Sequence, residues 1–289
     1  MEEKTSILLS NKLSSNIRSF SADKSELLRL FQILQERNNG ACEIEISHFN
    51  KGEMTDEEYE KNKNLLRKGF ELKLTVTGID GQELYGDVND IFGSPNFPDE
   101  IKTIYLNSEI PLSVNYQYHP RNSFTIFLDF SKPDIFDFSL LPSQPTPNGS
   151  NIQVKGYDAT WVHGLFNEFN TFINRRPSQV PWLHRHTIYD ILVWPFGIPF
   201  GFWSSYKLSG LVKTVFGNVS VFVESAAYVY VFLAALFLFR VLFHYARWIW
   251  PLVEYRTPKN KALKHRIFLS TITVGFIGKI IYDVIKSLF

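Results

Sequence analysis

The sequence has a single cysteine, Cys42, among its 289 residues. One cysteine excludes an intrachain disulfide and a metal site built on several thiolates, and it fits a reducing compartment. Recognisable catalytic motifs are missing too: the chain contains no GxSxG, HExxH, GxxxxGKS/T or GxGxxG pattern and no kinase motif set. We therefore predict no catalytic, cofactor-binding or metal residue and no cofactor, and the sequence leans against an enzyme.

Acidic residues become scarce in the last third of the chain. Residues 187–289 carry 4 acidic and 11 basic side chains, whereas residues 1–186 carry 25 and 19. The net charge of the whole chain is only +1, so no nucleic-acid partner attracted by overall charge is expected. The acids disappear where long hydrophobic runs begin, which excludes a purely soluble protein and a disordered one.

The N-terminus lacks the features of a signal peptide. Its first residues, MEEKTSILLSNKLSS, carry two early acids and only a short apolar stretch. A signal peptide needs a basic start and a longer apolar core, so we expect the N-terminal part to stay in the cytoplasm.

Residues 1–180 are predicted to form a soluble α+β domain, with a mostly antiparallel sheet and flanking helices. Apolar spacing and capping residues predict its helices, and alternating apolar residues predict its strands. The helices are expected from about Lys24 (capped by Asp23 or Ser21) to Arg37, from Thr55 to about Gly69, and from Asp158 or Thr160 to about Arg176. The strands are expected at 42–48, 72–76, 84–85, 101–106, 112–118, 123–130 and 152–154, with a hairpin turn at Asp80-Gly81 and a proline-rich loop over 133–150.

Residues 211–289 are predicted to form an all-α transmembrane region with helices at about 215–240 and 267–288. The run Val215–Phe239 has one acidic or basic side chain, Glu224, and as a helix it would span roughly 37 Å, enough for a hydrocarbon core of about 30 Å. A core helix of a soluble protein is rarely so long. The last run is uncharged from Ile267 to Gly278 and then carries charges along one helix face, so an interfacial helix is the alternative to a span there.

Residues 181–210 contain a shorter apolar stretch that prolines interrupt. Ile188–Trp203 includes Pro195 and Pro199, and it fits an interfacial segment, a re-entrant segment or a short span. Gly197 and Gly201 have the spacing of a helix-packing motif, although the nearby prolines weaken that signal.

The loop between the two predicted transmembrane helices is strongly basic, with one acid, Glu254. Basic loops stay in the cytoplasm, so a cytoplasmic N-terminal domain requires a third crossing, which Ile188–Trp203 would supply. The loop and its flanks could also contact anionic headgroups, but fixing the orientation is the favoured role. The predicted interfacial basic and aromatic residues are Arg240, Arg247, Trp248, Trp250, Lys261, Lys264 and Arg266.

Three charged residues fall within the predicted membrane segments: Glu224, Lys279 and Asp283. Antiparallel helices would bring Glu224 and Lys279 to a similar depth, and a lone charge at mid-bilayer costs about 2.5–3.5 kcal/mol, so pairing is expected. A structural contact between helices, or a neutral Glu224, is favoured over a polar path for ions or protons, because one pair does not make a pathway.

His184 and His186 place two imidazoles close together beside Arg185. A metal would need further ligands, and none stands at a recognisable spacing. A membrane-proximal basic cluster with Arg175 and Arg176 is therefore the favoured interpretation.

These features together predict an integral membrane protein with a cytoplasmic recognition or regulatory domain. One version is a signalling or membrane-perturbing effector, motivated by the polar residues in the membrane segments. The alternatives are a membrane-bound enzyme acting at the lipid interface and an accessory subunit of a transporter. The expected partners are the lipid bilayer (the inner or cell membrane in a bacterium), an unidentified cytoplasmic ligand or protein, and further copies of the chain.

Overall fold

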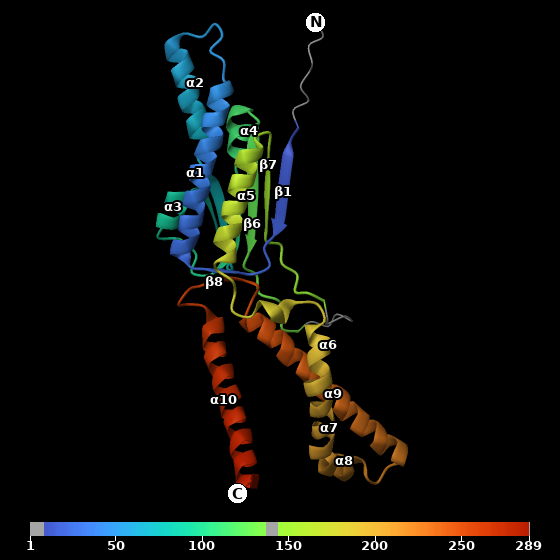
Figure 1. Cartoon of the computed structure of the whole chain (residues 1–289). Coiled ribbons are helices and arrows are strands. Elements are labelled where there is room, and N and C mark those ends of the chain that lie inside the picture. The colour runs from blue at the N-terminus through green and yellow to red at the C-terminus, as the bar shows by residue number, and fades with distance from the viewer. Residues whose placement is uncertain (1–8, 137–143, 289) are drawn as a thin grey trace. The chain divides into compact units, whose positions relative to one another are not determined.

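The computed structural model describes residues 9–136 and 144–288 and divides the chain into two compact units (Figure 1). The α+β unit comprises Met1–Ser131, Asn148–Ser178 and Leu252–Asn260. The helical unit comprises Lys132–Pro147, Gln179–Pro251 and Lys261–Phe289. Part of the predicted loop over 133–150 lies outside the described residues.

The α+β unit contains the antiparallel sheet that the sequence predicts, with strand order β1-β7-β6-β5-β3-β4. Alternate residues of its strands, such as Leu74, Ile104 and Ile126, are fully buried, as a period of two requires for a sheet covered on one face. The strands are β1 (Asn11–Asn16), β3 (Lys73–Gly78), β4 (Glu83–Asp87), β5 (Ile101–Asn107), β6 (Asn122–Asp129) and β7 (Asn151–Gly156).

Two long helices, α1 (Lys24–His48) and α5 (Ala159–Asn174), lie side by side and pack on this sheet (Figure 1). The predicted caps are confirmed: Asp23 accepts from the backbone of Glu26 at the start of α1, and Asp158 accepts from Trp161 at the start of α5. The unit also contains α2 (Asp56–Gly69), which begins after Thr55 as predicted, α3 (Val88–Gly93) and α4 (Ile110–Tyr116).

The prediction of a strand over 42–48 is wrong, because α1 continues to His48. Its buried stripe passes from Leu34 to Asn38, Cys42 and Glu45, and the two polar members hid the helical period. Both have a hydrogen-bond partner inside: Asn38 Nδ2 donates to the carbonyl of Phe70 at 2.5 Å, and Glu45 accepts from the Tyr118 hydroxyl at 2.5 Å. The Cys42 thiol is buried on this helix, and burial raises its pKa to about 11.

The prediction of a strand over 112–118 is also wrong, because this stretch begins inside the short helix α4. Pro111 stands in the first turn, where its missing N–H costs nothing. The helix ends at Gln117, which has a left-handed φ of 52°.

Three strands were not predicted, and each of them pairs with a strand that lies far away in the sequence. β1 reads NKLSSN, with one apolar residue, and its pairing with β7 supplies what its own sequence does not. β8 (Val253–Tyr255) pairs in parallel with β2 (Phe20–Ala22), across most of the length of the chain. β8 is the connection between the last two helices of the chain, so this connection is part of the α+β unit.

The helical unit contains one helix, α9 (Val221–Ile249), that is long and apolar enough to cross a membrane by length and composition, among the described residues. It is preceded by a helical stretch that runs through both prolines and followed by α10 (Lys261–Leu288). The preceding stretch is η1 (Pro181–His184), α6 (Ile188–Leu192), the π-helical η2 (Val193–Gly197), α7 (Ile198–Lys207) and α8 (Ser209–Phe216).

Candidate functional site: a helical hairpin and a clasp

The stretch from α6 to α7 packs antiparallel against α9. We call these two arms, with the connection between them, the hairpin. Gly197 faces Phe239 and Gly201 faces Phe232: a Cβ added at Gly201 would meet the Phe232 ring at 2.7 Å. At the far end of the hairpin, the Ser205 hydroxyl donates to the carbonyl of Tyr228 at 3.3 Å. The two glycines therefore serve as the close-packing positions that their spacing indicates.

The prolines do not break this arm of the hairpin. Pro199 stands in the first turn of α7, where a proline is tolerated, and Pro195 lies within the π-helical turn η2. The arm from Ile188 to Lys207 is helical throughout and is about 30 Å long at about 1.5 Å per residue.

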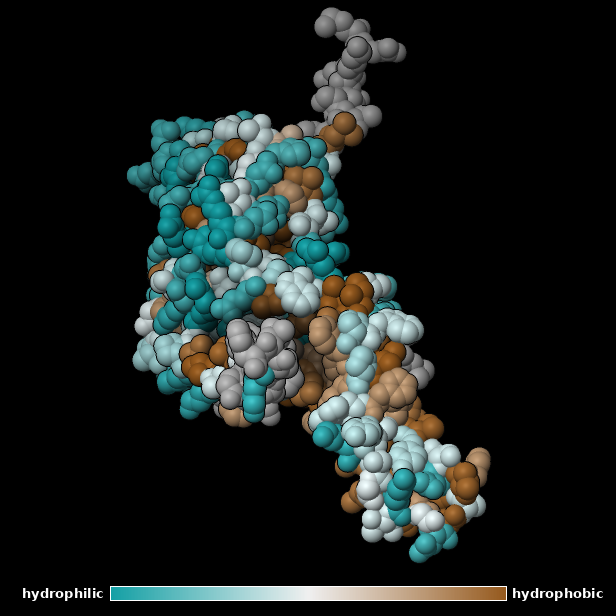
Figure 2. All heavy atoms as spheres, turned by 60° about the horizontal axis from the view of Figure 1, so that its bottom comes forward, coloured by the Kyte–Doolittle hydropathy of each residue, from teal (hydrophilic) through white to brown (hydrophobic). Residues whose placement is uncertain are grey.

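The hairpin exposes its apolar side chains. Only 11% of the most apolar 18-residue stretch of α9 is buried, whereas a core helix of a soluble protein would be mostly buried. Hydrophobic side chains cover much of the hairpin surface in Figure 2, whereas hydrophilic ones dominate the α+β unit. The most exposed large residues of the hairpin include Trp194 (72%), Tyr230 (74%) and Phe222 (81%).

A second feature is the segment Leu252–Asn260, which belongs to the α+β unit although it connects α9 to α10. We call this segment the clasp. The backbone of Phe20 donates to the carbonyl of Leu252 at 3.0 Å, and that of Arg256 donates to the carbonyl of Ala22 at 2.8 Å. Val253 and Tyr255 belong to the hydrophobic core, and the Tyr255 ring packs edge-on against Phe97 and Phe130. Burial raises the pKa of the Tyr255 phenol to about 12.

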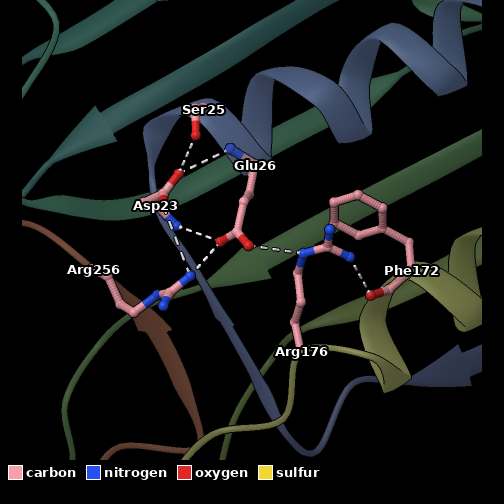
Figure 3. A network of polar contacts seen from close by, with 6 residues as sticks. All are labelled: Asp23, Ser25, Glu26, Phe172, Arg176 and Arg256. Atoms are coloured by element: carbon pink, nitrogen blue, oxygen red, sulfur yellow. Dashed lines mark hydrogen bonds and ion pairs between the residues drawn. The ribbon is translucent and has the colours of Figure 1, made fainter.

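Charged side chains reinforce the clasp (Figure 3). Glu26, in the first turn of α1, binds Arg256 from the clasp and Arg176 from the segment just after α5, the latter at 3.1 Å. Burial opposes ionisation of Glu26, but hydrogen bonds from the Asp23 backbone and from both arginines lower its pKa overall. Lys259 adds an ion pair to Asp99 at 2.7 Å.

Within the helical unit, a buried polar cluster ties the end of α9 to the segments that precede the hairpin. The His184 ring is 3% exposed: Nε2 donates to the carbonyl of Trp250 at 2.6 Å, and Nδ1 accepts from the Thr146 hydroxyl at 2.8 Å. Burial lowers the pKa of His184 to about 4, so the ring is neutral. Arg247 donates from Nε to the carbonyl of Leu183 at 3.1 Å.

The structure gives several predicted interfacial residues internal contacts. Arg266 donates to the carbonyl of Ile249 at 2.9 and 2.7 Å, and Trp248 packs against Tyr245 and His265. Trp250 caps α9, Arg240 lies half-buried on α9, and Lys264 is exposed on α10. The side chain of Lys261 lies outside the described part of the chain. The contacts of Arg247 and of the clasp were missed, since basic residues beside a long apolar run carry no sequence signal for an internal partner.

Glu224 lies half-buried in the first turn of α9, close to the tip of the hairpin. A carboxylate there meets the positive end of the helix dipole. Lys279 and Asp283 belong to α10, but their side chains lie outside the described residues, so the predicted pairing of Glu224 with Lys279 stays a prediction.

Among the residues that the structure describes, no group of three or more His, Cys, Asp or Glu side chains is placed to hold a metal ion. No family model, curated protein or solved structure matches the chain. The function is therefore inferred from the hairpin and the clasp alone.

Proposed function

We propose that this chain is an integral membrane protein whose α6–α9 hairpin crosses the bilayer and whose α+β unit is a recognition or regulatory domain. The exposed apolar surface of α9 supports this assignment, because lipid is the solvent in which such a surface is stable. α9 spans about 43 Å at about 1.5 Å per residue, so its last turns extend beyond a hydrocarbon core of about 30 Å.

The clasp is the observation that carries the orientation. Because Leu252–Asn260 is part of the α+β unit, the α+β unit and the end of α9 are on the same side of any membrane that α9 crosses. The chain leaves the α+β unit at Ser178 and returns to it at Leu252, so an even number of crossings lies between them. A hairpin of two arms meets that condition.

The charge distribution favours the cytoplasm as that side. Around the clasp stand Arg256, Lys259, Lys261, Lys264 and Arg266, and basic segments are retained in the cytoplasm during insertion. The tip of the hairpin and, if α10 spans, the C-terminus would then lie on the opposite side.

We favour recognition or regulation over catalysis, because the polar contacts described above join separate segments of the chain to one another. The clasp joins the α+β unit to both α9 and α10, so a ligand or partner that alters the α+β unit acts directly on the ends of two helices. A membrane-perturbing effector and an accessory transporter subunit are compatible versions of this proposal.

Side-specific thiol labelling tests the orientation. In a Cys42→Ala background, single cysteines are placed at Lys61 on α2 and at Asn218 near the hairpin tip, both exposed. Intact cells treated with a membrane-impermeant maleimide should be labelled at Asn218→Cys and not at Lys61→Cys, and lysed cells should be labelled at both. Equal labelling of the two positions in intact cells would contradict the crossing hairpin, and labelling of Lys61→Cys alone would invert the orientation.

A further inference from the structure

The α+β unit carries an arginine-lined groove that the proposed function does not use. The groove lies between α1 and α5 and has a volume of about 610 Å³. Its charged lining consists of four arginines and two glutamates: Glu26, Arg29, Arg37, Glu168, Arg175 and Arg176. Glu26, Arg29 and Arg37 belong to α1, and their spacings of three and eight residues put them on one face of the helix.

The two glutamates are already engaged. Arg37 Nε lies 2.5 Å from a carboxylate oxygen of Glu168, and Arg176 Nε lies 3.1 Å from one of Glu26. Glu26 is shared with Arg256 of the clasp. Arg29 and Arg175 are both exposed, and neither has an ion-pair partner among the described residues. The groove therefore keeps an excess of two positive charges, carried by planar groups that can donate paired hydrogen bonds.

We propose that this groove binds a phosphate-bearing anion, with Arg29 and Arg175 as its principal ligands. A guanidinium matches the geometry of phosphate oxygens through two parallel hydrogen bonds. A phosphate monoester carries about −1.5 to −2 charges near neutral pH, which matches the charge excess of the groove. The volume is in the range of small-molecule sites, so it holds a phosphorylated headgroup or a small phosphorylated molecule.

Two sources present the same chemistry. One is an anionic phospholipid, since Glu26 in the groove is bound to Arg256, five residues before the start of α10. The other is a free phosphorylated molecule of the cytoplasm. Binding of phosphate by these arginines does not depend on how α9 is oriented, so the groove can be tested separately from the proposed function.

The test is calorimetric titration of the full chain, purified in an uncharged detergent at low salt. One ligand is inorganic phosphate, a second is a short-chain phosphatidic acid below its micelle concentration, and acetate is the control ligand. The variant Arg29→Gln/Arg175→Gln should weaken phosphate or phosphatidic acid binding about tenfold or more, because it removes charge-assisted hydrogen bonds. The control Lys12→Gln/Lys68→Gln removes the same charge from exposed positions of the same unit and should bind as the wild type does.

The outcomes separate the sources. Binding of phosphatidic acid but not of inorganic phosphate identifies a lipid headgroup, and binding of inorganic phosphate identifies a ligand that needs no lipid. The proposal is overturned if neither ligand binds, if acetate binds equally well, or if the two double variants behave alike. Arg29→Lys/Arg175→Lys keeps the charge without the paired geometry, and it should give an intermediate affinity. None of these results depends on the labelling pattern, so failure of one proposal leaves the other standing.

Discussion

The two units of the chain treat apolar side chains in opposite ways. In the α+β unit the largest fully buried side chains are phenylalanines, including Phe20, Phe31 and Phe124. Among the described residues of the helical unit, Leu183, Tyr189 and Phe243 form a small buried cluster, and many rings of similar size face outward. The first pattern is the one expected in water and the second is the one expected in an apolar solvent, so a single average hydropathy describes neither. The clasp belongs to the first unit by packing and to the second by chain connection.

The largest effect is expected from a substitution in the clasp, which packs in the core of one unit and connects to the helices of the other. Tyr255→Ala removes a ring from the core beside Phe97 and Phe130 and should lower the free energy of unfolding by about 3–5 kcal/mol. Thermal unfolding of the full chain in detergent measures this. Limited proteolysis should show new cleavage within Leu252–Asn260.

Tyr255→Phe is the matched control for this prediction. It keeps the ring and should change stability by less than about 1.5 kcal/mol. If alanine and phenylalanine at this position gave the same unfolding temperature, the ring would not anchor the clasp.

A matched pair of leucines sharpens the contrast between the units. Leu233 on α9 is 55% exposed and Leu65 on α2 is 41% exposed, so a soluble protein would tolerate lysine at both. In a membrane, Leu233→Lys should cost about 3 kcal/mol, whereas Leu65→Lys on a wet surface should stay within about 0.5 kcal/mol. The fraction of each variant in the membrane pellet after carbonate extraction gives the comparison, and equal fractions would argue against lipid around α9.

The neutral His184 predicts a loss of stability in acid. Its pKa is about 4 in the folded protein and 6.5 in the reference state, so the unfolded chain binds the extra proton between these values. Stability should therefore fall as the pH drops from 6.5 to 4, by up to about 3 kcal/mol, and level off below. Unfolding temperatures in detergent at pH 7 and pH 5 measure the slope.

His184→Gln is the variant that isolates the contribution of His184 to the pH dependence of stability. It should be less stable at pH 7 and should show a smaller difference between the two pH values. A slope identical to that of the wild type would assign the acid sensitivity to other groups.

The smallest of these effects concerns the packing of the hairpin. A Cβ at Gly201 would overlap the Phe232 ring, so Gly201→Val should destabilise the hairpin by about 1–3 kcal/mol. Gly210, with nothing within 4 Å of an added Cβ, is the control position. A pair of cysteines at Ser205 and Tyr228 should crosslink less readily in Gly201→Val than in Gly210→Val, because the two arms separate.

Local signals in the sequence were enough for much of the sheet and for the helix starts at Asp23, Thr55 and Asp158. They failed where a buried polar side chain interrupted the pattern, as at Asn38 and Glu45 in α1. They also failed where the partner is distant: three residues of β8 carry no mark of a pairing with β2. The basic character of the clasp suggested a membrane surface, and the sequence held no sign that Arg256 and Lys259 bind acids of the α+β unit.

The clasp also sets an order of events during synthesis. Arg256 meets Glu26 across 230 residues of chain, so the α+β unit acquires its last strand only after α9 has left the ribosome. Contacts of such long sequence separation form late. At about 5–20 residues per second, the first part of the unit waits for some ten seconds or more with the site for β8 unfilled. Completion of the α+β unit therefore depends on the prior synthesis of α9. We expect a chain whose hairpin misfolds to keep an α+β unit that lacks β8 and is sensitive to proteases.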